Sequence, residues 1–242
     1  MGAVHADGIV SSDIVGYSTD SMVGGKFNMG GIGFTAVDGD DLDLNNITFN
    51  NLTKSDDSAT ADTLLVWDAN TSGYTTYYYY NAEGDEENWG WVDANWELPD
   101  SKLAAGTAFW FKAKAGEGKS MTQAGAIDSV ADTTYDIVGG KFNMLINPFS
   151  AAVDLNDETT IEFTNLTKSD DSATADTLLV WDATTSGYTT YYYYNAEGDE
   201  ENWGWVDANW ELPDAALPAG TAFWFKAKAG EGKKITFYNP TK

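Results

Sequence analysis

An internal duplication constrains the fold of this chain more than any other feature. Residues 51–119 align with residues 165–233 at an offset of 114, and upstream the match continues from 24–29 onto 139–144 at an offset of 115. Within the longer segment four pairs differ: Asn70/Thr184, Ser101/Ala215, Lys102/Ala216 and Ala104/Pro218. A repeat of about 115 residues is long enough to bury its own core. The sequence therefore predicts two tandem copies of one domain.

The domain boundaries follow from this alignment. We expect the first repeat at 7–123, a short connector at 124–126 and the second repeat at 127–242. So short a connector keeps the two domains in contact. Residues 1–6 end in small residues and are typical of a signal-peptide remnant or an added start, the alternative being an ordinary N-terminal tail. The signal-peptide interpretation predicts a secreted protein, extracellular or on the cell surface.

The composition excludes several classes of function. The chain has 13 basic and 38 acidic residues, hence a formal net charge of −25, one histidine (His5) and no cysteine. Thiol catalysis, disulfides and Cys/His zinc sites need residues that are absent. The negative charge repels nucleic acid, and no apolar run approaches the ~18 residues that membrane insertion requires. A protein that binds without covalent chemistry remains.

Short aromatic and β-branched runs bounded by Gly, Asn, Asp or Ser predict β-structure throughout. No segment longer than about ten residues has a helical apolar stripe. The alternation in 107–114 places Phe109 and Phe111 on one side and Trp110 with Lys112 on the other. We predict an all-β protein of two antiparallel β-sandwich domains, jelly-roll or immunoglobulin-like. The strands of the first copy are expected near 13–18, 26–29, 32–37, 46–50, 63–67, 74–80, 89–93, 107–114 and 119–123.

Four short motifs carry a resemblance. Lys-Phe-Asn-Met at 26–29, Leu-Val-Trp-Asp-Ala at 65–69, Gly-Tyr-Thr-Thr-Tyr at 73–77 and Leu-Pro-Ala-Gly-Thr-Ala-Phe-Trp-Phe-Lys-Ala at 217–227 resemble β modules repeated in many uncharacterised secreted and surface proteins of bacteria. The resemblance covers nearly the whole chain, and its motifs are packing and turn signals. It implies an exported β domain and assigns no activity and no site residues.

Aromatic side chains are the first candidate binding groups. Exposed rings bordered by carboxylates and amides suit sugar rings or a protein interface, in which Trp and Tyr are common anchors; alternatively, most of them fill a wide core. The alternating four-tyrosine runs put two rings on each face of their strand. The candidate platform residues are Trp89, Trp91, Trp96, Trp110, Tyr78 and Tyr80, with their copies Trp203, Trp205, Trp210, Trp224, Tyr192 and Tyr194.

Carboxylate clusters are the second candidate. Alternating oxygen donors favour Ca²⁺, although the 12-residue EF-hand spacing is missing, and a splayed, solvated loop is the alternative. A carboxylate pair acting as a glycosidase acid and base is a further alternative, but no carboxylate is isolated in an apolar run. The candidate Ca²⁺ ligands are Asp38, Asp40, Asp41, Asp43, Asp85, Glu86, Glu87, Asp199, Glu200 and Glu201.

Two functions remain in view. The first is a secreted, non-enzymatic structural protein of a bacterial surface layer, fibre or matrix, which assembles with itself or with another surface protein. We expect its two domains to meet head to tail, a contact that can repeat between chains, and an unpaired N-terminal strand at 14–17 to join a neighbouring sheet. The second is a protein that binds polysaccharide on the Trp and Tyr platforms, with Ca²⁺ as a possible requirement.

Overall fold

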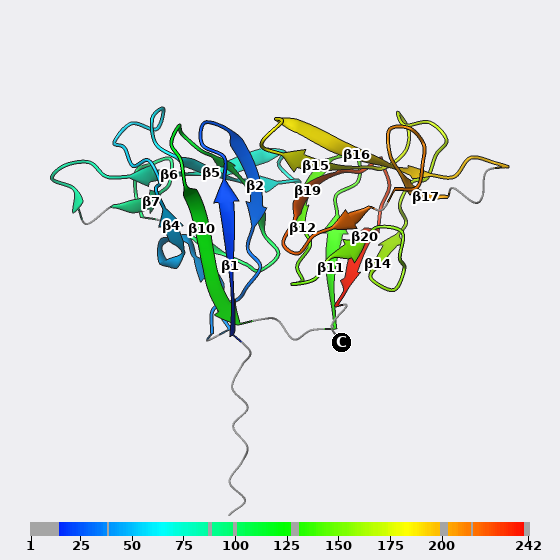
Figure 1. Ribbon diagram of the computed structural model, residues 1–242, viewed down its shortest axis with the longest axis horizontal. Helices are drawn as coiled ribbons and strands as arrows, with labels where there is room; N and C mark the ends of the chain where they lie inside the picture. The colour runs from blue at the N-terminus through cyan, green and yellow to red at the C-terminus, as the bar shows by residue number, and fades with distance from the viewer. Residues whose placement is uncertain are drawn as a thin grey trace, which may run out of the picture.

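The computed structural model describes residues 15–37, 39–86, 89–98, 101–126, 131–198, 203–213 and 215–239. They form two all-β domains that lie side by side (Figure 1). Among these residues no helix is long and apolar enough to cross a bilayer. The antiparallel sheets of the structure confirm the predicted fold class of antiparallel, sandwich-like β domains.

The described part of the first domain contains ten strands in three sheets. Its sheets have the orders β1-β10-β4, β2-β9-β5-β6-β7 and β3-β8, and every pairing is antiparallel. A single 3₁₀ turn, η1 (Leu44–Asn46), follows β3. The strands are β1 (Val15–Met22), β2 (Phe27–Gly31), β3 (Leu42–Asp43), β4 (Thr48–Asn50), β5 (Thr63–Asp68), β6 (Gly73–Tyr80), β7 (Gly90–Val92), β8 (Lys102–Leu103), β9 (Ala108–Lys112) and β10 (Lys119–Ala126).

The second domain repeats this arrangement. Its sheets have the orders β11-β20-β14, β12-β19-β15-β16-β17 and β13-β18, which are the equivalents of those in the first domain. The strands are β11 (Asp132–Ile137), β12 (Phe142–Ile146), β13 (Val153–Asp154), β14 (Ile161–Thr164), β15 (Thr177–Asp182), β16 (Gly187–Tyr194), β17 (Gly204–Val206), β18 (Ala216–Leu217), β19 (Ala222–Lys226) and β20 (Lys233–Tyr238).

Each domain has its own core between the three-stranded and five-stranded sheets. In the first domain, Leu64 of β5 and Phe111 of β9 share a buried cluster with Met121 of β10. Phe109 and Phe111 are each 1% exposed, which confirms the predicted inward side of this strand. Since side chains alternate along a strand, Trp110 points to the opposite face, and that face meets the other domain.

Three predictions of local structure are wrong. Residues 32–37 are not a strand; they form one isolated bridge, Thr35 with Ala126, and Ile32 N donates to Thr107 O at 2.8 Å. Residues 124–126 are not a connector, because they are the end of β10 and pair with Val15–Tyr17 of β1. The same pairing corrects the expected unpaired N-terminal strand over its described part, residues 15–17.

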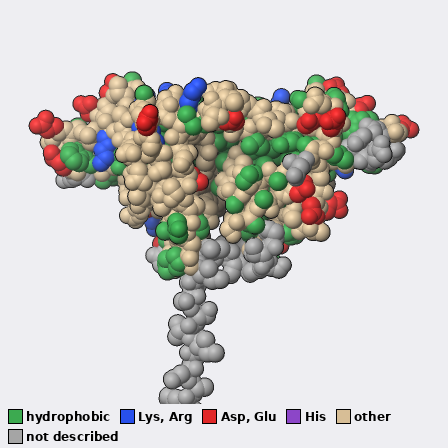
Figure 2. Space-filling model, viewed as in Figure 1, with side chains coloured by type: hydrophobic (Ala, Val, Ile, Leu, Met, Phe, Trp, Pro, Cys, Tyr) green, Lys and Arg blue, Asp and Glu red, His purple; other side chains and the backbone are tan. Residues whose placement is uncertain are grey.

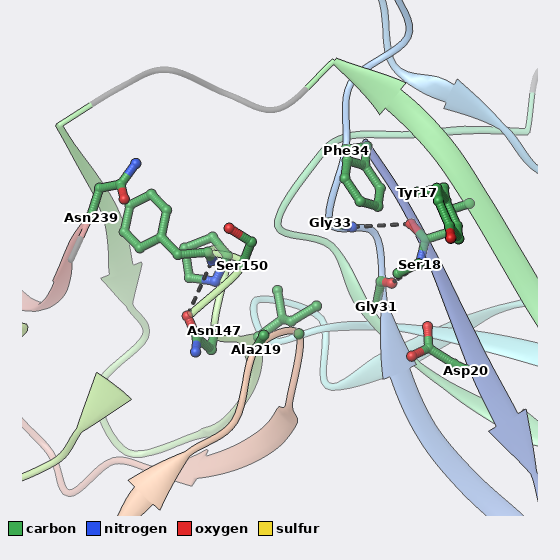
Figure 3. Close-up of a pocket in the computed structure, with 15 residues that line it drawn as sticks. Tyr17, Ser18, Asp20, Gly31, Gly33, Phe34, Asn147, Ser150, Ala219 and Asn239 are labelled. Atoms are coloured by element: carbon green, nitrogen blue, oxygen red, sulfur yellow. Dashed lines mark hydrogen bonds between the residues drawn. The ribbon is translucent and has the colours of Figure 1, made fainter. Parts of the chain in front are cut away.

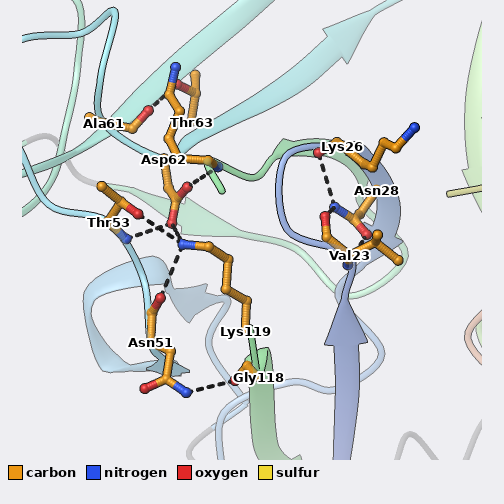
Figure 4. A network of polar contacts seen from close by, with 11 residues as sticks. Val23, Lys26, Asn28, Asn51, Thr53, Ala61, Asp62, Thr63, Gly118 and Lys119 are labelled. Atoms are coloured by element: carbon orange, nitrogen blue, oxygen red, sulfur yellow. Dashed lines mark hydrogen bonds and ion pairs between the residues drawn. The ribbon is translucent and has the colours of Figure 1, made fainter. Parts of the chain in front are cut away.

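In each domain a buried ion pair links the three-stranded sheet to the five-stranded sheet (Figure 4). Lys119 Nζ lies 2.7 Å from Asp62 Oδ2, and both side chains are almost fully buried. The Asp62 carboxylate also accepts from the backbone N–H groups of Thr53, at 2.7 Å, and Lys114, at 2.5 Å. The second domain repeats the pair with Lys233 and Asp176 at 2.8 Å. Because buried charges must be paired and hydrogen-bonded, the duplicated network is a structural feature of the domain.

The two domains contact each other through the outer faces of their five-stranded sheets. The indole Nε1 of Trp67 donates to Phe142 O at 2.7 Å, and the equivalent Trp181 donates to Phe27 O at 2.7 Å. The ring of Trp67 also meets that of Trp224 edge-on at 5.4 Å, as Trp181 meets Trp110 at 5.3 Å. Each of these tryptophan contacts thus recurs with the roles of the two domains exchanged.

Further reciprocal contacts lie at the ends of β2 and β12. Lys26 Nζ donates to Ser186 Oγ at 3.0 Å, and Lys141 Nζ donates to Ser72 Oγ at 3.0 Å. A contact that uses the same patch on both partners is isologous and closes on itself. The expected head-to-tail contact between the domains is therefore wrong, and this contact cannot extend from chain to chain.

Candidate functional site

An exposed aromatic surface lies where the two five-stranded sheets meet. We call it the aromatic saddle. It consists of two open hollows of ≈ 380 and ≈ 360 Å³ that are equivalent under the duplication and share two tyrosines. The saddle is formed by Phe27, Leu65, Trp67, Tyr74 and Trp110 of the first domain and Phe142, Leu179, Trp181, Tyr188 and Trp224 of the second.

The rings of the saddle are only partly covered by the contact between the domains. Phe27 and Tyr74 are 43% and 44% exposed, and their equivalents Phe142 and Tyr188 are 42% and 43% exposed. Burial raises the pKa of Tyr74 and of Tyr188 above the usual value near 10, so both hydroxyls are neutral at neutral pH. Contiguous exposed apolar surface of this kind marks an interaction site in soluble proteins.

Lysine side chains surround the saddle. Lys112 Nζ lies 5.7 Å from the centre of the Phe27 ring, and Lys226 Nζ lies 5.7 Å from that of Phe142. Lys26 directly precedes β2, the strand that contains Phe27, and Lys141 directly precedes β12, the strand that contains Phe142. Both lysines are exposed. Four of the 13 basic residues of a chain with net charge −25 thus border one apolar surface. Amino groups beside aromatic rings can attract a partner that carries both acidic and aromatic side chains.

An acidic segment with an exposed tryptophan lies at each far end of the molecule, beyond β6 and β16 (Figure 1). We call each one an acidic tip: Glu83, Asp85, Glu86 and Trp89 in the first domain, and Glu197 with Trp203 in the second. Trp89 and Trp203 are 43% and 45% exposed. Figure 2 shows acidic side chains at both ends of the long axis. The tips and the saddle therefore carry opposite charge.

A second aromatic cluster lies on the other face of the sheet from Trp89. Trp96 stacks on Tyr78, with ring centres 5.7 Å apart and planes at 23°, and it also contacts Tyr80. Trp96 has a φ of 65°, an uncommon conformation for a bulky residue. The hydroxyl of Tyr80 donates to Asp85 Oδ2 at 2.8 Å, which raises the Tyr80 pKa. Trp210, 36% exposed, repeats this cluster with Tyr192 and Tyr194.

The candidate platform residues therefore lie on different surfaces, and two of them are not accessible to a ligand. Trp91 and Trp205 are 1% and 0% exposed in the two cores, and among the described residues their indole N–H groups find no acceptor. Trp110 and Trp224 are 8% and 7% exposed at the floor of the saddle. The Trp91 ring packs against Phe49 and Phe111 in the core, and Asn45 Oδ1 accepts from Trp91 N at 2.7 Å at the outer edge of β7.

The predicted calcium sites receive no support from the described residues, in which no group of three or more acidic or His side chains could hold a metal. Asp43 Oδ1 instead accepts from Asn45 N and from the Ser101 hydroxyl, both at 2.9 Å. Asp40 pairs with Lys102 at 3.3 Å, and Asp41 is exposed. Asp85 and Glu86 lie in the acidic tip. The predicted ligands Asp38, Glu87, Asp199, Glu200 and Glu201 lie outside the described residues.

The second domain also has a groove that the sequence analysis missed. It has a volume of ≈ 540 Å³, and Trp203 and Leu212 line it together with Glu158 and Glu162. Tyr193 and Lys168 complete it, with Lys168 Nζ 4.7 Å above the tyrosine ring. Glu162 stands where the first domain has Thr48, and Glu158 lies in an insertion, so the first domain lacks both carboxylates at this position.

Comparison with known proteins gives no matching family model, no matching curated protein and no similar solved structure. The candidate sites therefore depend on the geometry alone. Sequence reasoning missed the saddle because its residues come from both domains, although one signal was present. In Thr63–Asp68 the alternation that buries Leu64 places Leu65 and Trp67 on the opposite, outer face.

Proposed function

We propose that this protein is a secreted, non-enzymatic structural protein that assembles copies of itself outside the cell, the acidic tip of one molecule docking in the aromatic saddle of another. The observation that carries the proposal is the saddle: exposed rings bordered by four lysines on a chain of net charge −25. An acidic tip with an exposed tryptophan complements both its charge and its apolar surface.

The arrangement of the sheet requires that this contact be made between molecules. In the strand order β2-β9-β5-β6-β7, β2 lies at the contact between the domains and β7 lies at the opposite edge, beside the tip. A chain therefore does not fold its own tip into its own saddle. A contact between two different surfaces is heterologous and can grow into an open assembly. With two tips and two hollows per chain, the assembly can extend as a fibre or a layer.

Charge reversal tests the proposal. Light scattering of the parent protein should show assemblies that grow with protein concentration and dissociate at 1 M salt, where the screening length falls to about 3 Å. The saddle variant Lys112→Glu/Lys226→Glu and the tip variant Glu83→Lys/Glu197→Lys should each stay monomeric, whereas an equimolar mixture of the two should assemble. Lys234→Glu, at an exposed lysine paired with Asp136 at 3.2 Å, should assemble like the parent. A parent protein that stays monomeric at every concentration contradicts the proposal.

Carbohydrate binding is the second candidate function, and the groove of the second domain favours it. An exposed indole beside carboxylates suits the face and the hydroxyls of a sugar, and Trp203 lies in the groove with Glu158 and Glu162. Neutral polysaccharides are the expected ligands, because the charge of the chain repels anionic ones.

The duplication supplies a matched control for this second function. In a polysaccharide pull-down, Trp203→Ala should reduce retention at least tenfold, whereas Trp89→Ala should change it less than twofold, because the first domain lacks Glu158 and Glu162. If the parent protein retains no neutral polysaccharide, or if both variants behave alike, the groove is not a sugar site.

A further inference from the structure

A pocket between the two domains breaks the symmetry of the duplication. It has a volume of ≈ 260 Å³ and lies between β1 of the first domain and the turn that follows β12 of the second (Figure 3). Its walls include Tyr17, Asp20 and Phe34 on one side and Asn147 and Phe149 on the other. The pocket is separate from the saddle and from the tips, and the function proposed above does not use it.

The pocket exists because an aspartate replaces a tyrosine. Asp20 in β1 is the equivalent of Tyr135 in β11: both lie two residues before the strand position that pairs with the buried lysine. Tyr135 fills its side of the contact, since its hydroxyl donates to Ile146 O at 3.1 Å and lies against Gly106. Gly220 is the equivalent of Gly106, and the space beside it is open.

A second pair of equivalent residues, next to the first, also differs between the two domains. Phe237 of β20 packs edge-on against Tyr135 with ring centres 5.8 Å apart. Its equivalent in β10 is Gln123, whose amide accepts from Gly33 N at 3.1 Å and donates to Gly31 O at 2.8 Å. An aromatic pair in one domain is thus replaced by a hydrogen-bonding pair in the other. Two polar replacements at contacting positions have emptied a site that the second domain keeps filled.

The walls of the pocket define the chemistry of a ligand. Of the described residues that line it, Asp20 alone carries a charge, and the rings of Tyr17, Phe34 and Phe149 supply apolar and π surface. Rings and a carboxylate together attract an organic cation, the rings through their negative faces. The volume is slightly below the usual range of about 300–1,000 Å³ for drug-sized ligands. We propose that this pocket binds a small organic cation, its ammonium group on Asp20 and its apolar body between the rings.

The surroundings of the Asp20 carboxyl support the proposed cation site. Burial raises the pKa of its carboxyl above the usual value, while a hydrogen bond from Gln123 partly opposes the shift. Because the Asp20 side chain is also open to solvent, an ammonium group can reach the carboxylate directly and offset the cost of its partial burial. The strongly negative charge of the whole chain also concentrates cations near it.

Benzylamine is the probe for the test, and benzyl alcohol, an uncharged analogue of similar size, is the control ligand. Isothermal titration should show one benzylamine site per chain and at least tenfold weaker binding of benzyl alcohol. Asp20→Asn, which keeps the shape of the side chain, should weaken benzylamine binding at least tenfold. Asp20→Tyr/Gln123→Phe copies the pair found in the second domain, so it should abolish binding while raising or preserving the temperature of unfolding.

The outcomes are distinct. Equal binding of benzylamine and benzyl alcohol, or unchanged benzylamine binding by both variants, overturns the proposal. No benzylamine binding by the folded parent protein also overturns it. Because the assembly assay uses lysine and tip variants that do not line this pocket, failure of the cation site and failure of assembly are observed separately.

Discussion

Replacing Trp67 and Trp181 together by alanine is expected to uncouple the two domains. Each substitution removes an indole that packs edge-on against a tryptophan of the other domain, at 5.4 or 5.3 Å, and a 2.7 Å hydrogen bond to a backbone carbonyl. Because these rings are half-buried, we expect each substitution to weaken the contact between the domains by about 2–3 kcal/mol. Both cores stay intact. Calorimetry should therefore change from one cooperative transition to two.

The control for this prediction is Trp89→Ala/Trp203→Ala. It removes the same number of indoles from positions that are 43% and 45% exposed and that do not touch the other domain. Its unfolding should remain a single transition. Small-angle scattering should show a larger radius of gyration for the Trp67/Trp181 variant and not for the control. One unchanged transition for both variants would mean that other contacts hold the domains together.

The uncoupled variant also bears on assembly. Since the saddle is built from both domains, separating them divides each hollow and removes the docking surface. We therefore expect this variant to stay monomeric where the parent protein assembles. The closed contact within a chain and the proposed contact between chains are thus linked, because the first creates the surface on which the second would depend.

Much of the fold could be predicted from the sequence, because the signals are local or repeated. The duplication predicts two equal domains, and the alternation around Phe109 and Phe111 predicts which face of the strand is buried. Residues 32–37 have the apolar pattern of a strand, but their backbone bonds to groups distant in sequence and does not pair along one adjacent strand. Ile32 N donates to Thr107 O, and Gly33 N donates to the side chain of Gln123.

The candidate sites were less predictable, because the partners of the aromatic residues are distant in sequence. Trp89 directly precedes β7 and Trp91 lies within it, yet one is 43% exposed and the other 1%. The difference comes from packing partners distant in sequence, because the Trp91 ring meets Phe49 and Phe111 in the core. In the same way, Trp110 forms part of the saddle only because Trp181 of the second domain lies beside it. The composition predicts that aromatic residues form the candidate binding surfaces, and tertiary contacts decide which of these residues are exposed there.

Replacing Lys119 by methionine is expected to have the largest effect on stability of any single substitution proposed for this chain. Lys119 Nζ donates to Asp62 Oδ2 at 2.7 Å and to Asn51 O and Thr53 Oγ1, each at 3.0 Å, in a site closed to solvent. Without it the buried Asp62 carboxylate loses its counter-charge. Removing one partner of a buried pair costs about 3–5 kcal/mol, so the first domain should unfold at markedly lower denaturant concentration.

A second variant separates the loss of charge pairing from simple loss of packing. In Asp62→Asn/Lys119→Met, asparagine buries no charge, and its single carbonyl oxygen can still accept from one of the two backbone N–H groups, those of Thr53 and Lys114, that bond different oxygens of Asp62. This double variant should recover at least half of the lost stability, since an uncharged pair removes the desolvation cost. Lys102→Met breaks an exposed pair, with side chains 44% and 65% exposed, and should change stability by about 0.5 kcal/mol or less. If Lys119→Met were no more destabilising than Lys102→Met, the buried ion pair would not hold the two sheets together.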